Sequence, residues 1–307
     1  MQSLPVLIPL PSHDYDPSEV AVSWQALTQA GFNVVFATVD AKPAQADVMM
    51  LNGEGLDPWG FIPLLKKIPL IGLMLRANKS ARDAHEKMVL SAQFQHPILY
   101  QDLRVEDFSG LILPGGHAPR MRQYLEDKTL QGFVADFFEQ SQQALESNTL
   151  VAKPVGAICH GVVLAARAIS KKTGKSVLCG KKTTALTWKL EKSAWDLTRF
   201  YARFWDSNYY RTYQEKAGDP KGHHGVQQEV MRALENDDDF LDVPKKTSGY
   251  LMKTLGLFRD SEKDARPAWV VRDDYYISGR WPGDVHTFAN QYIEVLKESQ
   301  NIASVAI

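Results

Sequence analysis

The stretch Val155-Gly156-Ala157-Ile158-Cys159-His160-Gly161-Val162-Val163-Leu164-Ala165 decides the fold. It begins with a short apolar run of strand length and ends with small residues typical of a closely packed helix. Gly156 and Gly161 flank the polar pair Cys159-His160, and they allow a sharp turn that larger side chains would crowd. The stretch therefore predicts a strand, a tight turn and a helix, with Cys159 at the carboxyl end of a sheet, where open α/β folds bind ligands.

The first part of the chain predicts a parallel sheet. Val6-Leu7-Ile8 is a short apolar strand. Asp16 at the cap, Pro17 at the first helical position and Glu19 three residues after the cap form a strong helix start. A β-branched and aromatic run over Asn33 to Thr38 follows. Strand, helix and strand in this order make a βαβ unit, which predicts parallel pairing.

The rest of the chain continues this alternation with two interruptions. The predicted elements are a strand over Phe108 to Leu113, a helix over Thr129 to Leu145, a hairpin around Arg272-Asp273-Asp274 and a final helix from Val285 to Lys297. Periodicity is lost at about residues 41–107 and 188–265, which we interpret as insertions that cap the sheet. We therefore predict one α/β domain over residues 1–307, with a doubly wound, mostly parallel sheet.

Composition excludes several classes of partner and location. With 35 Lys and Arg against 36 Asp and Glu, the chain lacks the basic excess of a nucleic-acid-binding protein. The apolar stretch Phe61 to Leu75 is interrupted by charges and a proline, so no membrane span is expected. Residues 1–11 contain three prolines and no basic segment, so they do not resemble a signal peptide. Two cysteines in 307 residues favour a reducing, cytoplasmic setting.

The two cysteines are not equivalent. Cys159 stands at a helix start beside a histidine, where the helix dipole favours an anion, so its thiolate is expected to form more easily than that of a free cysteine. Cys179, in Ser-Val-Leu-Cys-Gly, has none of these neighbours and is interpreted as a packing residue.

Two further signals accompany the cysteine. Gly115 and Gly116 directly follow a predicted strand, so the Gly116 N–H can approach a ligand and stabilise a developing oxyanion. His117 comes next and is either a wall of the pocket or an exposed turn residue. Glu19, taken alone, is explained as a capping-box residue.

In combination, these residues resemble the ThiJ/PfpI superfamily, whose flavodoxin-like fold is shared with class I glutamine amidotransferase domains. The segments that carry the resemblance are Ala157 to Gly161, Leu113 to His117 and Glu19. The two insertions are similar to those of the larger chaperone and glyoxalase III branch. The resemblance implies that Cys159 is the reactive thiol, Glu19 its acid/base partner and His160 the adjacent histidine. It also implies an oxyanion site made by backbone N–H groups near Gly116 and His160.

The resemblance also implies a function. The leading hypothesis is a cysteine-dependent lyase or hydrolase of the glyoxalase III or deglycase type, which converts glyoxal or methylglyoxal to a hydroxy acid without glutathione, metal or organic cofactor. One alternative is a stress-response chaperone or redox sensor with an oxidisable Cys159. Another is amidase or peptidase chemistry, which requires a histidine oriented by an acid. The expected partner is a small carbonyl substrate.

Several residues remain open as further members of the site. Glu191 lies in the region where related triads place an acid behind the histidine, but a surface carboxylate explains it equally well. Asp284 and His286 follow a strand and could line the same mouth, although Asp284 is also a candidate N-cap. Arg280 could attract a carboxylated substrate or pair with a surface acid.

Two other features have no assigned role in catalysis. His223-His224 lies in a Gly-rich stretch without metal-ligand spacing, so a loop is expected there and no metal site. The apolar segment Pro63 to Leu75 offers a surface for a homodimer, and a capped monomer fits the sequence as well.

Overall fold

The computed structural model describes residues 4–147 and 151–305 and is built around a seven-stranded sheet. The strand order is β5-β3-β1-β6-β7-β9-β8, and only β8 runs antiparallel to its neighbour. The strands are β1 (Val6–Pro9), β3 (Val34–Thr38), β5 (Ile98–Leu99), β6 (Gly110–Leu113), β7 (Val155–Ile158), β8 (Val270–Asp273) and β9 (Tyr276–Gly279). A separate parallel pair joins β2 (His13–Tyr15) to β4 (Gln45–Ala46). The predicted doubly wound α/β fold is confirmed.

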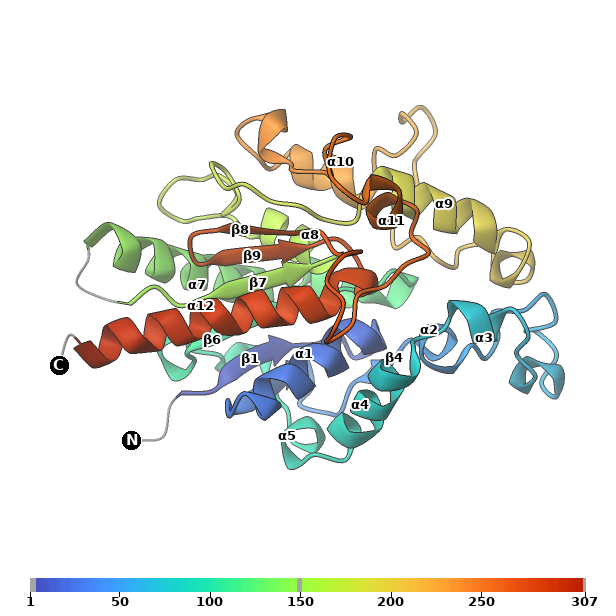
Figure 1. The fold of residues 1–307 in the computed structure, drawn as a ribbon, viewed down its shortest axis with the longest axis horizontal. Helices are drawn as coiled ribbons and strands as arrows, with labels where there is room; N and C mark the ends of the chain where they lie inside the picture. Colours follow the sequence, from blue (N-terminus) through green and yellow to red (C-terminus); the bar gives the residue numbers. More distant parts are fainter. Residues whose placement is uncertain (1–3, 148–150, 306–307) are drawn as a thin grey trace.

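Helices cover both faces of this sheet (Figure 1). The longer ones are α1 (Pro17–Gln29), α4 (Lys79–Val89), α7 (Lys128–Ser147), α8 (Gly161–Arg167), α9 (Trp188–Thr198) and α12 (Val285–Val305). The shorter ones are α2 (Val48–Asn52), α3 (Gly72–Leu75), α5 (Ala92–Gln95), α6 (Arg122–Glu126), α10 (Val226–Met231) and α11 (Tyr250–Thr254). α1 and α12 pack together on one face with α4 against α1, and α7 and α8 pack on the other. None of the described helices is long and apolar enough to cross a bilayer.

The topology fixes where a ligand site can form. β1 lies between β3 and β6. The strands that follow β1 are added first on the β3 side and then, from β6 on, on the other side, so the winding reverses at β1. In doubly wound sheets such a reversal opens a crevice at the carboxyl ends of the strands. Figure 1 shows these ends meeting α2, α3, α9 and α11, while both chain termini lie at the opposite end of the sheet.

The local signals at the start of the chain act as predicted. The Asp16 side chain accepts hydrogen bonds from the N–H groups of Ser18 and Glu19, and Pro17 occupies the first turn of α1. Strands β1 and β3 on either side of this helix pair in parallel. The predicted βαβ unit is therefore confirmed.

The segment 41–107 is not wholly an insertion outside the sheet. Its last part forms β5, which pairs with β3 through Ala37–Ile98 and Thr38–Leu99 and is the edge strand of the sheet. A two-residue strand is too short to produce a periodic pattern, so the sequence did not indicate it. The elements of this segment that lie past the carboxyl ends of the strands are α2, α3 and the turns between them.

Candidate active site

Cys159 lies on a strained turn between β7 and α8. Its φ of 56° is in the left-handed region, which side chains other than glycine adopt at a cost. The Cys159 N–H donates to the Gly279 carbonyl at 3.0 Å and holds this conformation. Gly161 permits the turn, because a Cβ there would lie 1.9 Å from the Leu113 carbonyl oxygen. The sharp turn at Cys159, which we call the elbow, therefore packs directly against the backbone at the end of β6.

The turn after β6 contains Gly115 and Gly116, and it is also in close backbone contact with its neighbours. A Cβ on Gly115 would lie 2.6 Å from the His160 nitrogen, and one on Gly116 would lie 2.3 Å from the Asp14 carbonyl oxygen. Both glycines are therefore required by close packing. Among the described residues, no acceptor takes the Gly116 N–H, which remains available to a ligand in the cavity that Gly116 lines.

Glu19 is free of the capping role. The Asp16 N–H, which a capping-box glutamate would accept, donates instead to the Gly115 carbonyl at 2.8 Å. Glu19 is fully buried, and its Oε2 accepts from the Gly115 N–H at 2.7 Å. Its Oε1 accepts no hydrogen bond from a nitrogen or oxygen donor among the described residues. The group that interacts with this carboxyl from the elbow is the Cys159 thiol.

Glu19 and Cys159 are buried side by side, and each affects the pKa of the other. Burial raises the pKa of Glu19, and the charge of Asp16 raises it further. Burial also raises the pKa of the Cys159 thiol, and Glu19 and Asp16 add to this, against a lowering contribution from the His160 N–H. The expectation of an easily formed thiolate is therefore wrong, because burial and the two acids raise the pKa of the thiol more than the helix start lowers it. The raised pKa favours the protonated form of the thiol.

His160 is buried and neutral. Its Nδ1 lies 3.4 Å from the Cys159 sulfur. Burial lowers the pKa of His160 to about 3, and the nearby charges of Arg167 and Arg211 contribute to this shift. Among the described residues no carboxylate hydrogen-bonds to the His160 ring. A Cys-His-acid triad is therefore not assembled in this structure.

His117 lies in the wall of the cavity and is not an exposed turn residue. Its Nε2 is 3.2 Å from the Tyr209 hydroxyl and 3.5 Å from an Asp47 carboxylate oxygen. Its ring stacks on Tyr210 with 4.2 Å between ring centroids. Burial lowers the pKa of His117 to about 4, so the ring is a neutral wall.

These groups face a cavity of about 290 Å³. The polar part of its lining includes Asp16, Glu19, Cys159 and Arg259. Its apolar part comes mainly from residues 41–107 and 188–265, the two cap regions. It includes Met50, Leu56, Leu75, Leu186, Leu190, Leu197, Leu255, Leu257 and Trp281. A largely apolar pocket with a few convergent polar groups is the usual form of a small-molecule site.

The structure adds Tyr210, Arg259 and Trp281 to the site. The sequence did not indicate Tyr210 or Arg259, because both lie in a region without periodicity. Trp281 follows β9, and its position directly after a strand was the one available signal. All three line the cavity with Cys159.

Glu191 is neither a surface carboxylate nor an acid behind His160. It is buried, its Oε1 accepts from the Arg211 side chain at 3.2 Å, and its Oε2 accepts from the Val226 N–H at 2.9 Å. The interpretation as a surface residue is therefore wrong. Glu191 joins α9 to the start of α10 and shows no hydrogen bond to His160.

Asp284 and His286 do not line the cavity. Asp284 is fully buried in an ion pair with Arg280. Arg280 therefore pairs with an acid, but the expectation that this acid lies on the surface is wrong. His286 lies in a separate surface hollow beside α1 and α12. Asp284 does not cap α12 either, because Asp260 accepts the N–H groups of His286 and Thr287. The sequence pattern could not show this, since Asp260 is distant along the chain.

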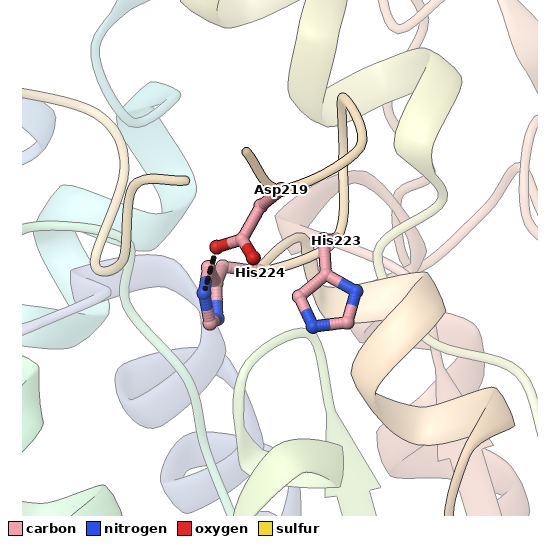
Figure 2. Close-up of side chains that lie close together, drawn as sticks. All are labelled: Asp219, His223 and His224. Atoms are coloured by element: carbon pink, nitrogen blue, oxygen red, sulfur yellow. Dashed lines mark hydrogen bonds and ion pairs between the residues drawn. The ribbon is translucent and has the colours of Figure 1, made fainter. Parts of the chain in front are cut away.

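His223 and His224 lie in a loop, as expected, and a third group joins them (Figure 2). The ligand atoms of Asp219, His223 and His224 lie within 4.8 Å of one another, and it is the single such group among the described residues. Asp219 already accepts a hydrogen bond from His224 at 2.9 Å. Two ligands of one tetrahedral zinc ion are about 3.4 Å apart, so the cluster would have to contract around a metal. We assign it no metal.

Comparison with known proteins identifies a family. A family model described as "ThiJ/PfpI family-like" matches residues 10–220, which is more than half of the chain. An uncharacterised protein of Schizosaccharomyces pombe is 27% identical over 159 residues, and an uncharacterised protein of Archaeoglobus fulgidus is 35% identical over 80 residues. These matches span 51% and 26% of this chain. They span 54% and 40% of the two relatives, so neither relative is matched over its whole length.

Solved structures match over nearly the whole chain. Rapid Encystment Protein of Francisella tularensis superposes with a TM-score of 0.58 at 13% identity, covering 95% of this chain and 99% of that one. A glyoxalase III of Candida albicans superposes with a TM-score of 0.57 at 15% identity, covering 96% and 98%. At such identities the likeness concerns the fold.

Proposed function

Since this chain belongs to the ThiJ/PfpI family, we propose that it is a cysteine-dependent enzyme that converts α-oxoaldehydes to 2-hydroxy acids without glutathione. The observation that carries the proposal is the buried pair of the Glu19 carboxyl and the Cys159 thiol at the base of the cavity. A structural neighbour with the same fold is a glyoxalase III.

The first step is addition of the thiol to the aldehyde. The Cys159 sulfur bonds to the aldehyde carbon, and Glu19 passes the thiol proton to the carbonyl oxygen, which gives a hemithioacetal. The Gly116 N–H and the His160 N–H supply hydrogen bonds to the oxygen as charge develops on it. A protonated resting thiol suits this step, because the same carboxyl that takes the proton also delivers it.

The second step moves a hydrogen between neighbouring carbons. Glu19 releases its own proton to solvent, and its carboxylate removes the hydrogen from the carbon bound to sulfur. The hydroxyl proton moves to the neighbouring carbonyl oxygen, and an enediolate forms. Glu19 then returns that proton to the adjacent carbon, and the former aldehyde carbon becomes a thioester carbonyl. Water cleaves the thioester, so one oxoaldehyde and one water give one 2-hydroxy acid and the free thiol. A carboxyl with a raised pKa suits both transfers.

The experiment is a Cys159→Ala substitution assayed for methylglyoxal loss and lactate formation, with Cys179→Ala as the matched control. Cys179 lies outside the cavity. We expect Cys159→Ala to lose turnover by at least about 10³-fold and Cys179→Ala to retain it. Lactate formation by Cys159→Ala at the parental rate would exclude the proposal.

Redox sensing by Cys159 has less support. Oxidation by peroxide begins from the thiolate, and burial together with two acids disfavours the thiolate here. Intact mass after mild peroxide distinguishes the two functions: sensing predicts a gain of two oxygens on Cys159 without turnover of any aldehyde.

Amidase or peptidase chemistry has the least support. It needs a histidine that accepts and returns a proton, and burial holds His160 neutral with no carboxylate on its ring among the described residues. We expect His160→Ala to retain most of the dicarbonyl turnover. Amide hydrolysis that His160→Ala abolishes would favour the amidase function instead.

A further inference from the structure

Arg259 is held at the cavity by the start of α12. The next residue, Asp260, accepts the N–H groups of His286 and Thr287, and its own N–H donates to the Gly283 carbonyl at 2.8 Å. These three hydrogen bonds fix the backbone beside Arg259. The Arg259 side chain lies over Trp281, with 5.5 Å between the guanidinium carbon and the ring centroid, and both side chains line the cavity.

The guanidinium of Arg259 has no ionic partner in the described part of the chain. No carboxylate forms an ion pair with it and no acceptor takes a hydrogen bond from it, although the side chain is half-buried. Other buried arginines differ: Arg211 pairs with Glu191 and Glu215, and Arg280 pairs with Asp284. Five oriented donors are therefore available to something that enters the cavity.

The acids nearest to Arg259 do not satisfy it. Asp16 attracts the guanidinium across the cavity, but its Oδ1 already accepts two backbone hydrogen bonds at the start of α1. Glu19 also faces it, and burial favours the uncharged form of that carboxyl. Among the described residues that line the cavity, Arg259 is the one permanently charged cation, since His117 stays neutral.

We propose that Arg259 binds a carboxylate of the substrate, so that the preferred substrates are α-oxoaldehydes whose far end is a carboxylate. This inference rests on the proposed function and names its substrate class. A planar guanidinium matches a carboxylate with two parallel hydrogen bonds. The leucine-rich walls fit a short apolar linker between the two ends. One cation suits a singly charged carboxylate better than a phosphate.

The first experiment reads the site without catalysis. Iodoacetate and iodoacetamide alkylate the same sulfur and differ by a carboxylate against a neutral amide. Their rates at Cys159 and Cys179 are measured by peptide mass spectrometry in one sample. We expect Arg259→Met to lower the iodoacetate to iodoacetamide rate ratio at Cys159 by 10- to 100-fold, on the order of one charged hydrogen-bonded contact. Arg259→Lys is expected to retain part of the ratio.

Two controls accompany this measurement. Cys179 lines a different hollow, so its ratio is expected to stay constant and to show whether each variant has folded. Arg266→Met removes an exposed arginine that pairs with Asp264 and is expected to leave both ratios unchanged. An unchanged ratio at Cys159 in folded Arg259→Met would overturn the inference.

The second experiment compares 4,5-dioxopentanoate with its methyl ester. The carboxylate compound would take up one water and give 2-hydroxyglutarate. We expect its kcat/KM to exceed that of the ester by about 10- to 100-fold, and Arg259→Met to abolish the difference. Arg259-dependent alkylation without turnover of either compound would retain the carboxylate site and reject the proposed function. Turnover of both compounds at equal rates, with unchanged alkylation ratios, would reject the carboxylate site alone.

Discussion

Two neighbouring strands of the sheet end in buried ionisable groups, and the two ends differ in how those groups are satisfied. After β9, Arg280 and Asp284 are 1% and 0% exposed, and two hydrogen bonds of 2.8 Å join their side chains. After β7, the Cys159 thiol meets the Glu19 carboxyl, one oxygen of which has no ordinary donor among the described residues. Arg259 lines the same cavity and forms no ion pair with any residue that the structure describes.

The difference separates ionisable groups that stabilise the fold from those that are candidates for function. The Arg280–Asp284 pair is closed by further bonds: the Trp269 N–H donates to Asp284, and the Arg280 guanidinium donates to the Lys253 carbonyl. Buried polar groups are normally satisfied in this way, because desolvation without a partner is costly. Groups left unsatisfied beside a cavity are therefore candidates for chemistry. Both ends carry ionisable groups, and their hydrogen-bond partners distinguish them.

The first way to test this comparison is Glu19→Gln. The amide keeps the size of the side chain and removes the group that transfers protons. We expect kcat/KM for oxoaldehydes to fall about 10²- to 10⁴-fold, the usual effect of losing a general acid/base. Burial penalises the charged form of Glu19, so the free energy of unfolding is expected to stay equal or to rise. Steady-state kinetics and urea unfolding measure both. Lost stability with retained turnover would assign Glu19 to structure.

The second test addresses the closed pair through Asp284→Asn. The substitution leaves a buried guanidinium without its counter-charge, so the free energy of unfolding is expected to fall by about 3–5 kcal/mol. Urea unfolding measures the loss. Asp264→Asn, at the exposed pair with Arg266, is the matched control and is expected to leave the unfolding midpoint unchanged. Adding Arg280→Met to Asp284→Asn should recover part of the loss, and additive losses would contradict the pairing.

The third test opens the contact between the two turns with Gly161→Ala. The new Cβ would overlap the Leu113 carbonyl oxygen, so the backbone must shift at a cost of about 1–3 kcal/mol of stability. Displacement of Cys159 is expected to lower kcat/KM by about 10²-fold. Gly132→Ala, in α7 with nothing within 4 Å of the new Cβ, is the control. It is expected to raise stability by up to about 1 kcal/mol. Equal behaviour of the two variants would remove the packing argument.

The sequence predicted those parts of the site that depend on neighbouring residues. The cap at Asp16, the proline at the start of α1 and the glycines around Cys159 are local signals, and the structure places them in the expected elements. The order of strands then brings the turns after β1, β6 and β7 together. The approach of Glu19 to the elbow follows from that topology.

The sequence did not predict the parts that depend on distant pairing. Arg259 lines the cavity because Asp260 caps α12, and nothing near residue 260 announces that partner. Glu191 and Asp284 were misread for the same reason: each binds an arginine, Arg211 in one case and Arg280 in the other. The raised pKa of Cys159 depends on burial and on the charges of Glu19 and Asp16, which an argument from the helix start alone does not include.

The smallest expected effect concerns the strain at the elbow. At a φ of 56°, glycine is favoured over alanine, so Cys159→Gly should be more stable than Cys159→Ala by about 1 kcal/mol. Cys179 has no such backbone strain, and there alanine should be the more stable by about 0.4–1 kcal/mol, because glycine leaves the unfolded chain more freedom. The two cysteines thus predict opposite signs in one unfolding assay.

An equal sign at both positions would mean that the elbow stores no strain. Opposite signs would show that the fold holds Cys159 in an unfavourable conformation. The close contact with the turn after β6 must then supply the free energy that this conformation costs. The Arg280–Asp284 pair after β9 stabilises the fold, whereas the elbow after β7 is held in its strained conformation by the fold. On this view the stability of one strand end supports the reactivity of the other.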